Sequence, residues 1–136
     1  IKASREYYVK ATDEYPILFI ISALTKGTSI FKNVGGLKNK ESDRVKEMQK
    51  VLRQVGIRTL LSKNELRIFG KGMINGNNKK IIVQNLGDHR IAMSAFVLAS
   101  LTGAKAKIKN FETVFTSSPS FLKIMKFLGA KFEKQK

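Results

Sequence analysis

The chain has 136 residues, 43% of them apolar, which suits one compact domain or part of a larger one and excludes a disordered tail. Cysteine is absent, which excludes disulfides, thiolate metal sites and a cysteine nucleophile, and no apolar run reaches the roughly 18–20 residues that span a bilayer. The formal net charge of +16 fits compositional drift, a nucleic-acid binder or an enzyme for anionic substrates, and does not choose among them.

The first two thirds of the chain alternate helical and strand patterns without a linker-like stretch. Pro16 in an acidic first turn marks the first helix. A second helix begins at Ser42 or Asp43 and ends at Gly56. Its apolar stripe consists of Val45, Met48, Val51, Leu52 and Val55. In chain order we expect a helix at 13–25, a strand at 28–34, a helix at 43–55, hairpin strands at 57–61 and 65–69, and a strand at 81–83.

A second cycle of elements resembles the first. It is predicted to contain a helix at 88–101, a strand at 106–110, a helix at 119–128 and a strand at 130–133. "FIISALT" at 19–25 aligns with "FVLASLT" at 96–102, and "IFKN" at 30–33 aligns with "KIKN" at 107–110 at the same offset of 77 residues. Such a repeat indicates duplication of a small sheet-and-helix unit. We therefore expect an α/β (α+β) fold with repeat units at about 12–84 and 85–136.

Charged residues gather at the starts of predicted helices, where unsatisfied N–H groups and the helix dipole favour anions. An aspartate is an ordinary cap there, which is the plain interpretation of Asp43 and Asp88. Arg44 and Arg90 lie in first turns as well, against the dipole. They either pair with a local carboxylate, for which Asp43 and Asp88 are candidates, or bind an external anion.

The single histidine, His89, lies between Asp88 and Arg90. A lone histidine is more often a structural or surface residue than a catalyst. With one histidine and no cysteine, a metal would need carboxylates, and these are scattered, so no metal site is expected. The sequence has no dinucleotide-binding, P-loop, zinc-protease or serine-hydrolase motif.

Four motifs occur together in a distinctive order: "DEYPIL" at 13–18, "KESDR" at 40–44, "GDHRIAMS" at 87–94 and "TSSPSF…LGAK" at 116–131. From about Thr12 to Phe132 the chain resembles the C-terminal third of the 5-enolpyruvylshikimate-3-phosphate synthases, or 3-phosphoshikimate 1-carboxyvinyltransferases. Members have two similar domains of three βαβαββ units each and an active site in the cleft between them. The resemblance implies that residues 1–136 are the C-terminal part of one such domain, with two copies of a βαβαββ-type unit.

The resemblance also implies a carboxyvinyl transfer in chorismate and aromatic amino acid biosynthesis. The 5-hydroxyl of shikimate 3-phosphate attacks C2 of phosphoenolpyruvate while C3 gains a proton, and the tetrahedral intermediate then loses phosphate. No metal or organic cofactor takes part. By motif match Arg44 and Arg90 would clamp phosphoenolpyruvate. Asp13 and Lys40 would bind shikimate 3-phosphate, with Lys40 near the reacting hydroxyl. Asp13 and Glu41 would share proton transfer, and His89 would support the site by hydrogen bonding.

The six residues are expected to share one face of the fold, each near the surface at a helix start. Two departures from the family pattern stand beside them. Lys38 and Asn39 replace an arginine and a valine, and Thr116 stands where some members carry a phosphate-binding lysine, so Thr116 is not assigned to the site.

The partners expected from the resemblance are phosphoenolpyruvate, shikimate 3-phosphate and the rest of the same polypeptide, without which the chain should be inactive. A start at Ile1 rather than methionine also suggests an excised or processed segment. No signal peptide is recognisable, so a cytoplasmic location is the default and no membrane partner is expected. The alternative is a small basic nucleic-acid-binding α/β module; otherwise nucleic acid is not an expected partner.

Overall fold

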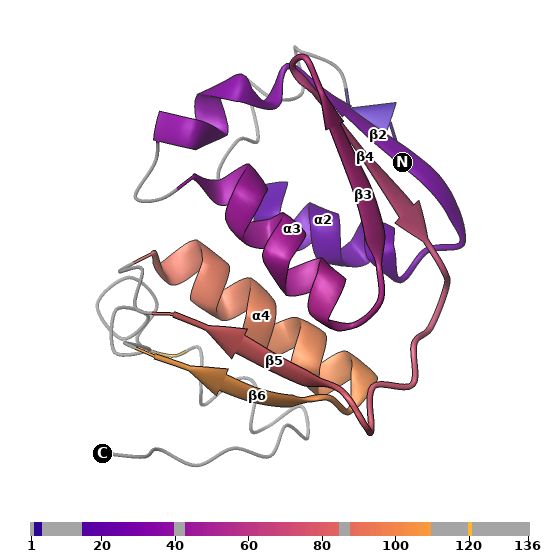
Figure 1. Ribbon diagram of the computed structural model, residues 1–136, viewed down its shortest axis with the longest axis vertical. Coiled ribbons are helices and arrows are strands. Elements are labelled where there is room, and N and C mark those ends of the chain that lie inside the picture. Colours follow the sequence, from indigo (N-terminus) through magenta and orange to yellow (C-terminus); the bar gives the residue numbers. More distant parts are fainter. Residues whose placement is uncertain (1, 4–14, 40–42, 85–87, 110–119, 121–136) are drawn as a thin grey trace.

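The computed structural model describes residues 2–3, 15–39, 43–84, 88–109 and 120. Three α-helices lie between a larger and a smaller β-sheet (Figure 1). In chain order the elements are β1 (Lys2–Ala3), α2 (Tyr15–Ala23), β2 (Gly27–Lys32), the 3-10 helix η2 (Val34–Asn39), α3 (Arg44–Gln54), β3 (Arg58–Ser62), β4 (Glu65–Gly70), β5 (Lys80–Val83), α4 (His89–Thr102) and β6 (Lys105–Ile108).

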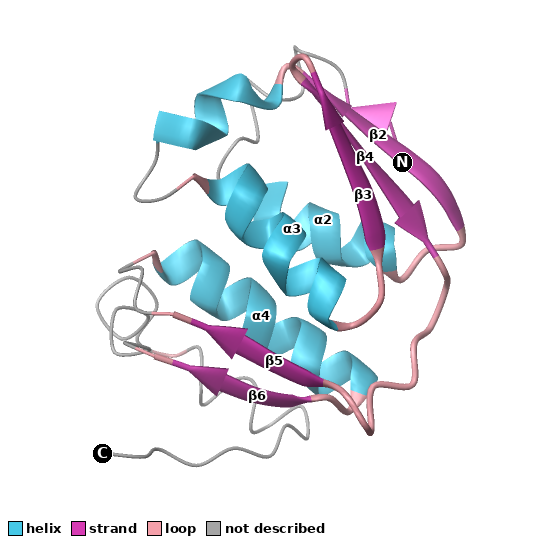
Figure 2. Cartoon of the chain, viewed as in Figure 1, coloured by secondary structure: helices cyan, strands magenta, loops and turns pink. Residues whose placement is uncertain are grey.

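The larger sheet has the strand order β1-β2-β4-β3, and the smaller sheet pairs β5 with β6 (Figure 2). The pairs β2–β4 and β3–β4 are antiparallel, whereas β1–β2 and β5–β6 are parallel. Among the described residues, helix α2 lies between the paired strands β1 and β2 in the sequence, and helix α4 lies between β5 and β6. The repeat units predicted at about 12–84 and 85–136 extend beyond the described residues and stay a prediction.

The predicted elements are confirmed wherever the structure describes them. The 43–55 helix is α3, with Asp43 as its N-cap, and the hairpin is β3–β4. The structure adds the 3-10 helix η2, which the sequence patterns missed, and the short strand β1. The helix and strand predicted at 119–128 and 130–133 lie outside the described residues.

The β3–β4 hairpin is fixed to the end of β2 by its turn. Lys63 and Asn33 both have positive φ angles, of 56° and 61°, which lets the chain turn sharply at both places. The side-chain amide of Asn64 donates to the side-chain oxygen of Asn33 at 2.8 Å. The backbone carbonyl of Asn64 accepts from the Val34 N–H at 3.0 Å. These two bonds hold the turn against the segment that leads into η2.

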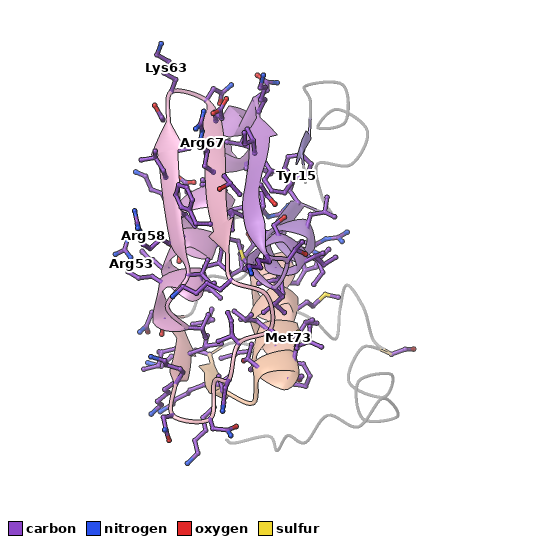
Figure 3. The ribbon with its side chains drawn as sticks, turned by 90° about the vertical axis from the view of Figure 1, so that its right-hand side faces the viewer. Tyr15, Arg53, Arg58, Lys63, Arg67 and Met73 are labelled. Atoms are coloured by element: carbon purple, nitrogen blue, oxygen red, sulfur yellow. The ribbon has the colours of Figure 1, made fainter. Side chains whose placement is uncertain are left out.

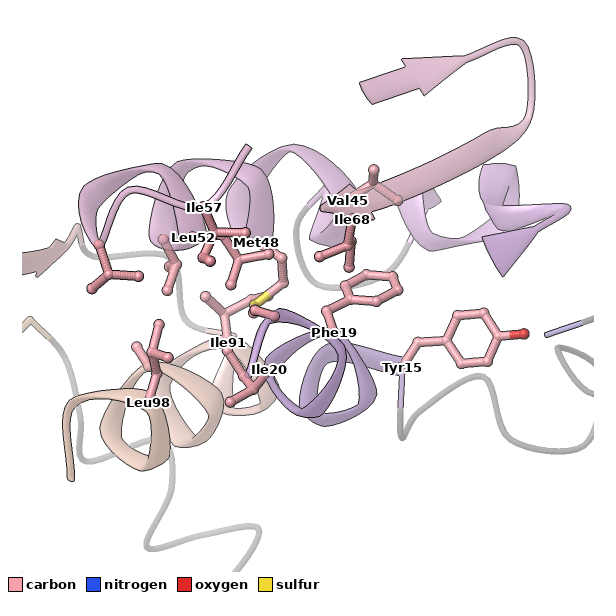
Figure 4. Close-up of a cluster of buried hydrophobic side chains, with 14 of the residues drawn as sticks. Tyr15, Phe19, Ile20, Val45, Met48, Leu52, Ile57, Ile68, Ile91 and Leu98 are labelled. Carbon is pink, nitrogen blue, oxygen red and sulfur yellow. The ribbon is translucent and has the colours of Figure 1, made fainter. Parts of the chain in front are cut away.

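The core lies among the three helices and reaches both sheets, and Figure 4 shows part of it. All five residues of the predicted α3 stripe are at most 2% exposed. They face apolar side chains of α2 and α4, among them Phe19, Ile20 and Ile91. Phe19 also meets Phe31 of β2 edge to face, with ring centroids 4.8 Å apart. This packing holds α3 and α4 side by side and so determines where their first residues lie.

Candidate active site

The start of α3 is capped by its own sequence. Asp43 precedes the helix, and its side chain accepts a hydrogen bond from the Lys46 N–H at 3.3 Å. Its carbonyl accepts from the Glu47 N–H at 3.0 Å, closing the first turn. A carboxylate at this position satisfies a free N–H group and complements the helix dipole. Of the two expected caps, Asp43 fills this position, and Ser42 lies outside the described residues.

The start of α4 has the same design. Asp88 has an extended backbone, and its Oδ1 accepts from the Arg90 N–H at 3.1 Å. Its carbonyl accepts from the Ala92 N–H at 3.2 Å. The predicted helix start at this aspartate is confirmed. His89 and Arg90 therefore occupy the first turn of α4, and both are partly buried.

A buried ion pair joins the two helix starts. The Nε of Arg44 donates to Oδ2 of Asp88 at 3.0 Å, and its Nη2 donates to Oδ1 at 3.2 Å. The side chains are 2% and 0% exposed. Two parallel bonds between a guanidinium and a carboxylate fix both the distance and the plane of the pair. The first residue of α3 and the N-cap of α4 are thereby held together, although 44 positions separate them in the sequence.

The predicted site residues fall into two groups. Arg44, His89 and Arg90 are described. The Arg44–Asp88 pair holds the start of α3, which contains Arg44, against the start of α4, which contains His89 and Arg90. Asp13, Lys40 and Glu41 lie outside the described residues, so their part in the shared face stays a prediction.

Two features of this region differ from the expectations or extend them. The expectation that every site residue lies near the surface is wrong for Arg44, because Asp88 and the core around the two helices enclose its guanidinium. Local pairing with a carboxylate was one of the alternatives left open for Arg44, and the structure identifies Asp88 as a partner. Asp88 was expected only as a cap or local partner. The sequence signal that points to this role of Asp88 is its position just before a helix start that carries an arginine.

Within the described residues there is no group of three or more His, Cys, Asp or Glu side chains that could hold a metal ion. No helix there is both long enough and apolar enough to cross a bilayer. A hollow of about 430 Å³ lies between α3 and strand β5. Lys50, Arg53, Gln54 and Ile82 help to line it. Arg44, Asp88, His89 and Arg90 are not among the residues that line it.

These features define an α/β protein that brings two capped, arginine-bearing helix starts together between its sheets. The family model for EPSP synthase (3-phosphoshikimate 1-carboxyvinyltransferase) matches residues 2–125. The chain belongs to this family of enzymes. The predicted family membership and the α/β class are thereby confirmed.

Curated relatives and solved structures agree with this assignment. The chain is 36% identical over 126 residues to the 3-phosphoshikimate 1-carboxyvinyltransferase of Clostridium tetani, covering 93% of this chain and 28% of that protein. It is 40% identical over 121 residues to the enzyme of that name from Campylobacter hominis, covering 89% and 27%. A solved EPSP synthase from Acinetobacter baumannii superposes with a TM-score of 0.80 at 31% identity, covering 99% of this chain and 31% of that one. The chain thus spans between a quarter and a third of the length of these relatives.

Proposed function

We propose that this chain is the C-terminal part of an enzyme that transfers the enolpyruvyl group of phosphoenolpyruvate to the 5-hydroxyl of shikimate 3-phosphate and releases phosphate. The observation that carries the proposal is the family match over residues 2–125. In this proposal residues 1–136 belong to one domain, with repeat units at about 12–84 and 85–136. The second domain would come from the rest of the same polypeptide, so the segment alone would be inactive.

Phosphoenolpyruvate carries a carboxylate and a phosphate, so its site needs fixed cations. Arg44 and Arg90 are proposed to supply them, because guanidinium groups match both anions with paired N–H donors. The capped starts of α3 and α4 support this role, since each adds the positive end of a helix dipole to the same region. The Arg44–Asp88 pair supports it further by keeping the two helix starts adjacent.

The remaining roles concern the acceptor and the protons. Lys40 and Asp13 are proposed to bind shikimate 3-phosphate. Asp13 and Glu41 are proposed to remove the proton of the attacking hydroxyl and to protonate C3 of phosphoenolpyruvate. Lys40 and Glu41 precede Arg44 closely in the sequence, and His89 adjoins Asp88 at the start of α4, where it is proposed to support the site by hydrogen bonding. All of these groups belong to the chain itself, so the proposal requires no cofactor.

The nucleic-acid alternative receives less support from the described surface. Arg58, Lys63 and Arg67 lie on the larger sheet and its turn (Figure 3). Arg67 pairs with Glu65 at 2.9 Å, and the Arg58 guanidinium lies 5.5 Å from the centre of the Phe69 ring. Within the described residues the exposed large apolar side chains are aliphatic or methionine, whereas single-strand binders stack bases on exposed aromatic rings.

The test uses the purified full-length protein that contains this segment. Phosphate release should require both phosphoenolpyruvate and shikimate 3-phosphate, and each substrate omitted in turn serves as the control. A folded protein that releases no phosphate with both substrates would overturn the proposal. Titration with single-stranded and duplex nucleic acid across salt tests the alternative, which predicts micromolar binding that weakens steeply as salt rises.

A further inference from the structure

We propose that Asp88 is a positioning residue that presets Arg44 and Arg90 for one shared anion. The inference rests on the proposed function, because it concerns how the phosphoenolpyruvate site is organised. Asp88 would not touch the substrate. It would act through the two arginines, by holding the side chain of one and the backbone of the other.

The geometry assigns both tasks to one carboxylate. Oδ2 accepts from the Arg44 Nε, and Oδ1 is shared between the Arg44 Nη2 at 3.2 Å and the Arg90 N–H at 3.1 Å. A shift of the Arg44 guanidinium would therefore disturb the cap of α4, and a shift of α4 would disturb Arg44. The Asp88 side chain is fully buried, so water does not compete for these bonds.

Stability alone is a weak reason for such an arrangement. A buried ion pair gains little over a well-packed apolar pair, because both charges lose their hydration. Two arginines at two positive helix ends also repel each other. A carboxylate bonded to the Arg44 guanidinium and to the Arg90 N–H offsets part of that repulsion before any substrate arrives. A preset pair of cations loses less conformational freedom on binding an anion than two mobile side chains would.

Asp88 also has an opposing effect, because its negative charge competes with a substrate anion for Arg44. The proposal holds that fixed geometry outweighs this competition. Removing the charge should then weaken the binding of phosphoenolpyruvate, although the site becomes more positive. Stronger binding after the same change would mean that Asp88 acts only as a competing anion, and would overturn the proposal.

The decisive variant is Asp88→Asn in the full-length protein, since asparagine still caps a helix but lacks the charge. The matched control is Asp43→Asn, the same exchange at the N-cap of α3, where the side chain bonds to the Lys46 N–H. We expect Asp88→Asn to raise the KM for phosphoenolpyruvate about tenfold to a hundredfold, with the KM for shikimate 3-phosphate within about twofold. Asp43→Asn should change neither constant.

A double-mutant cycle separates positioning from general damage. When Arg44 is already replaced by methionine, Asp88→Asn should add little to the KM for phosphoenolpyruvate, because most of its effect passes through Arg44. If Asp88→Asn raises the KM for phosphoenolpyruvate as much in the Arg44→Met variant as in the wild type, the proposal is overturned. It is also overturned if Asp88→Asn raises the KM values of both substrates in parallel. If Asp88→Asn fails to fold, Asp88→Glu keeps the charge and displaces it by one methylene. A folded Asp88→Glu enzyme with an unchanged KM for phosphoenolpyruvate would likewise overturn it.

The proposed function and this inference fail in different ways. A wild-type protein without carboxyvinyl transfer would remove the proposed function and the inference together. An active wild type in which Arg44→Met leaves the KM for phosphoenolpyruvate unchanged would overturn the role of Asp88 and leave the reaction in place. An active enzyme in which Arg44→Met raises that KM and Asp88→Asn does not would show Asp88 to be purely structural.

Discussion

The side-chain amide of Gln54 bonds to both backbone polar groups of Ile82, accepting from its N–H at 2.8 Å and donating to its carbonyl oxygen at 3.2 Å. On the other side of β5, the carbonyls of Lys79 and Val83 accept from the chain at β6. Gln54 thus meets the outer edge of β5 as a neighbouring strand would. Because it is the last residue of α3, it anchors the far end of that helix to the smaller sheet.

Replacing Gln54 with leucine should loosen β5 locally. Both bonds to Ile82 are lost, and we expect a cost of about 1–2 kcal/mol in the free energy of unfolding, since Ile82 is 40% exposed and water partly replaces the amide. Hydrogen exchange of the Ile82 amide should accelerate. Arg53→Leu, at the exposed neighbouring position of the same helix, is the control and should leave that amide protected. Equal exchange in both variants would contradict the prediction.

Met48 tests the core between α3 and the other helices. It is fully buried, so Met48→Ala should lower the free energy of unfolding by about 2–5 kcal/mol through lost apolar contacts and a cavity. Leu60→Ala is the control, because Leu60 is 51% exposed on β3 and should change stability by no more than about 0.5 kcal/mol. Urea unfolding of the two variants under the same conditions measures the difference.

The elements that sequence analysis predicts best are those whose pattern is local. The α3 stripe repeats at helical spacing, and the β3–β4 turn is marked by polar residues between two apolar runs, so both could be placed from the sequence. The 3-10 helix η2 was missed because Gly35 and Gly36 weaken any helical pattern there.

The Arg44–Asp88 pair could not be predicted for a different reason. Both residues could be placed at helix starts, yet Asp43 is adjacent to Arg44 in the sequence and was an equal candidate as its partner. Asp43 instead caps its own helix, and the packing of α3 against α4 brings Asp88 to the guanidinium. That packing depends on contacts between distant segments, such as Met48 with the core around Ile91, which no local pattern contains.

Gly70 should tolerate no side chain. A Cβ atom built there would overlap the carbonyl oxygens of Ser22 and Thr25 at the end of α2. Because these are backbone atoms, Gly70→Ala should displace β4 from α2 and cost more than about 2 kcal/mol. Gly27→Ala is the informative comparison, since Gly27 has open space around it but a φ of 113°. Gly27→Ala should cost only the backbone strain, about 1–2 kcal/mol of stability. If thermal unfolding shows Gly27→Ala to be more destabilising than Gly70→Ala, the steric argument is refuted.

Arg90→Ala should separate folding from substrate binding. Arg90 lies in the first turn of α4 and is only partly buried, so its loss should cost within about 0.5–1 kcal/mol of stability. In the full-length enzyme the change removes a charge-assisted contact of about 1.5–3 kcal/mol. The KM for phosphoenolpyruvate should therefore rise roughly tenfold or more. Arg58→Ala, on the larger sheet, is the control and should leave that KM unchanged; a comparable rise there would point to a general effect of charge.

Arg44 should behave differently, because its removal leaves a buried carboxylate without its main cation. Arg44→Met is expected to destabilise the protein by about 3–5 kcal/mol. Adding Asp88→Asn removes the unpaired charge while keeping a residue that caps α4, so the double variant should be more stable than Arg44→Met alone. The exposed pair provides the control: Arg67→Met breaks the bond to Glu65 and should cost no more than about 1 kcal/mol.

The same double variant separates the two roles of Arg44. If Arg44 binds phosphoenolpyruvate, the double variant should recover stability in thermal unfolding but not the KM for phosphoenolpyruvate, because methionine offers no N–H donors to an anion. Recovery of both would show that Arg44 serves only to pair with Asp88, and its proposed contact with the substrate would have to be abandoned. A single variant Arg44→Met that costs less than about 1 kcal/mol would contradict the buried pair itself, since only a hydrated carboxylate can lose its partner so cheaply.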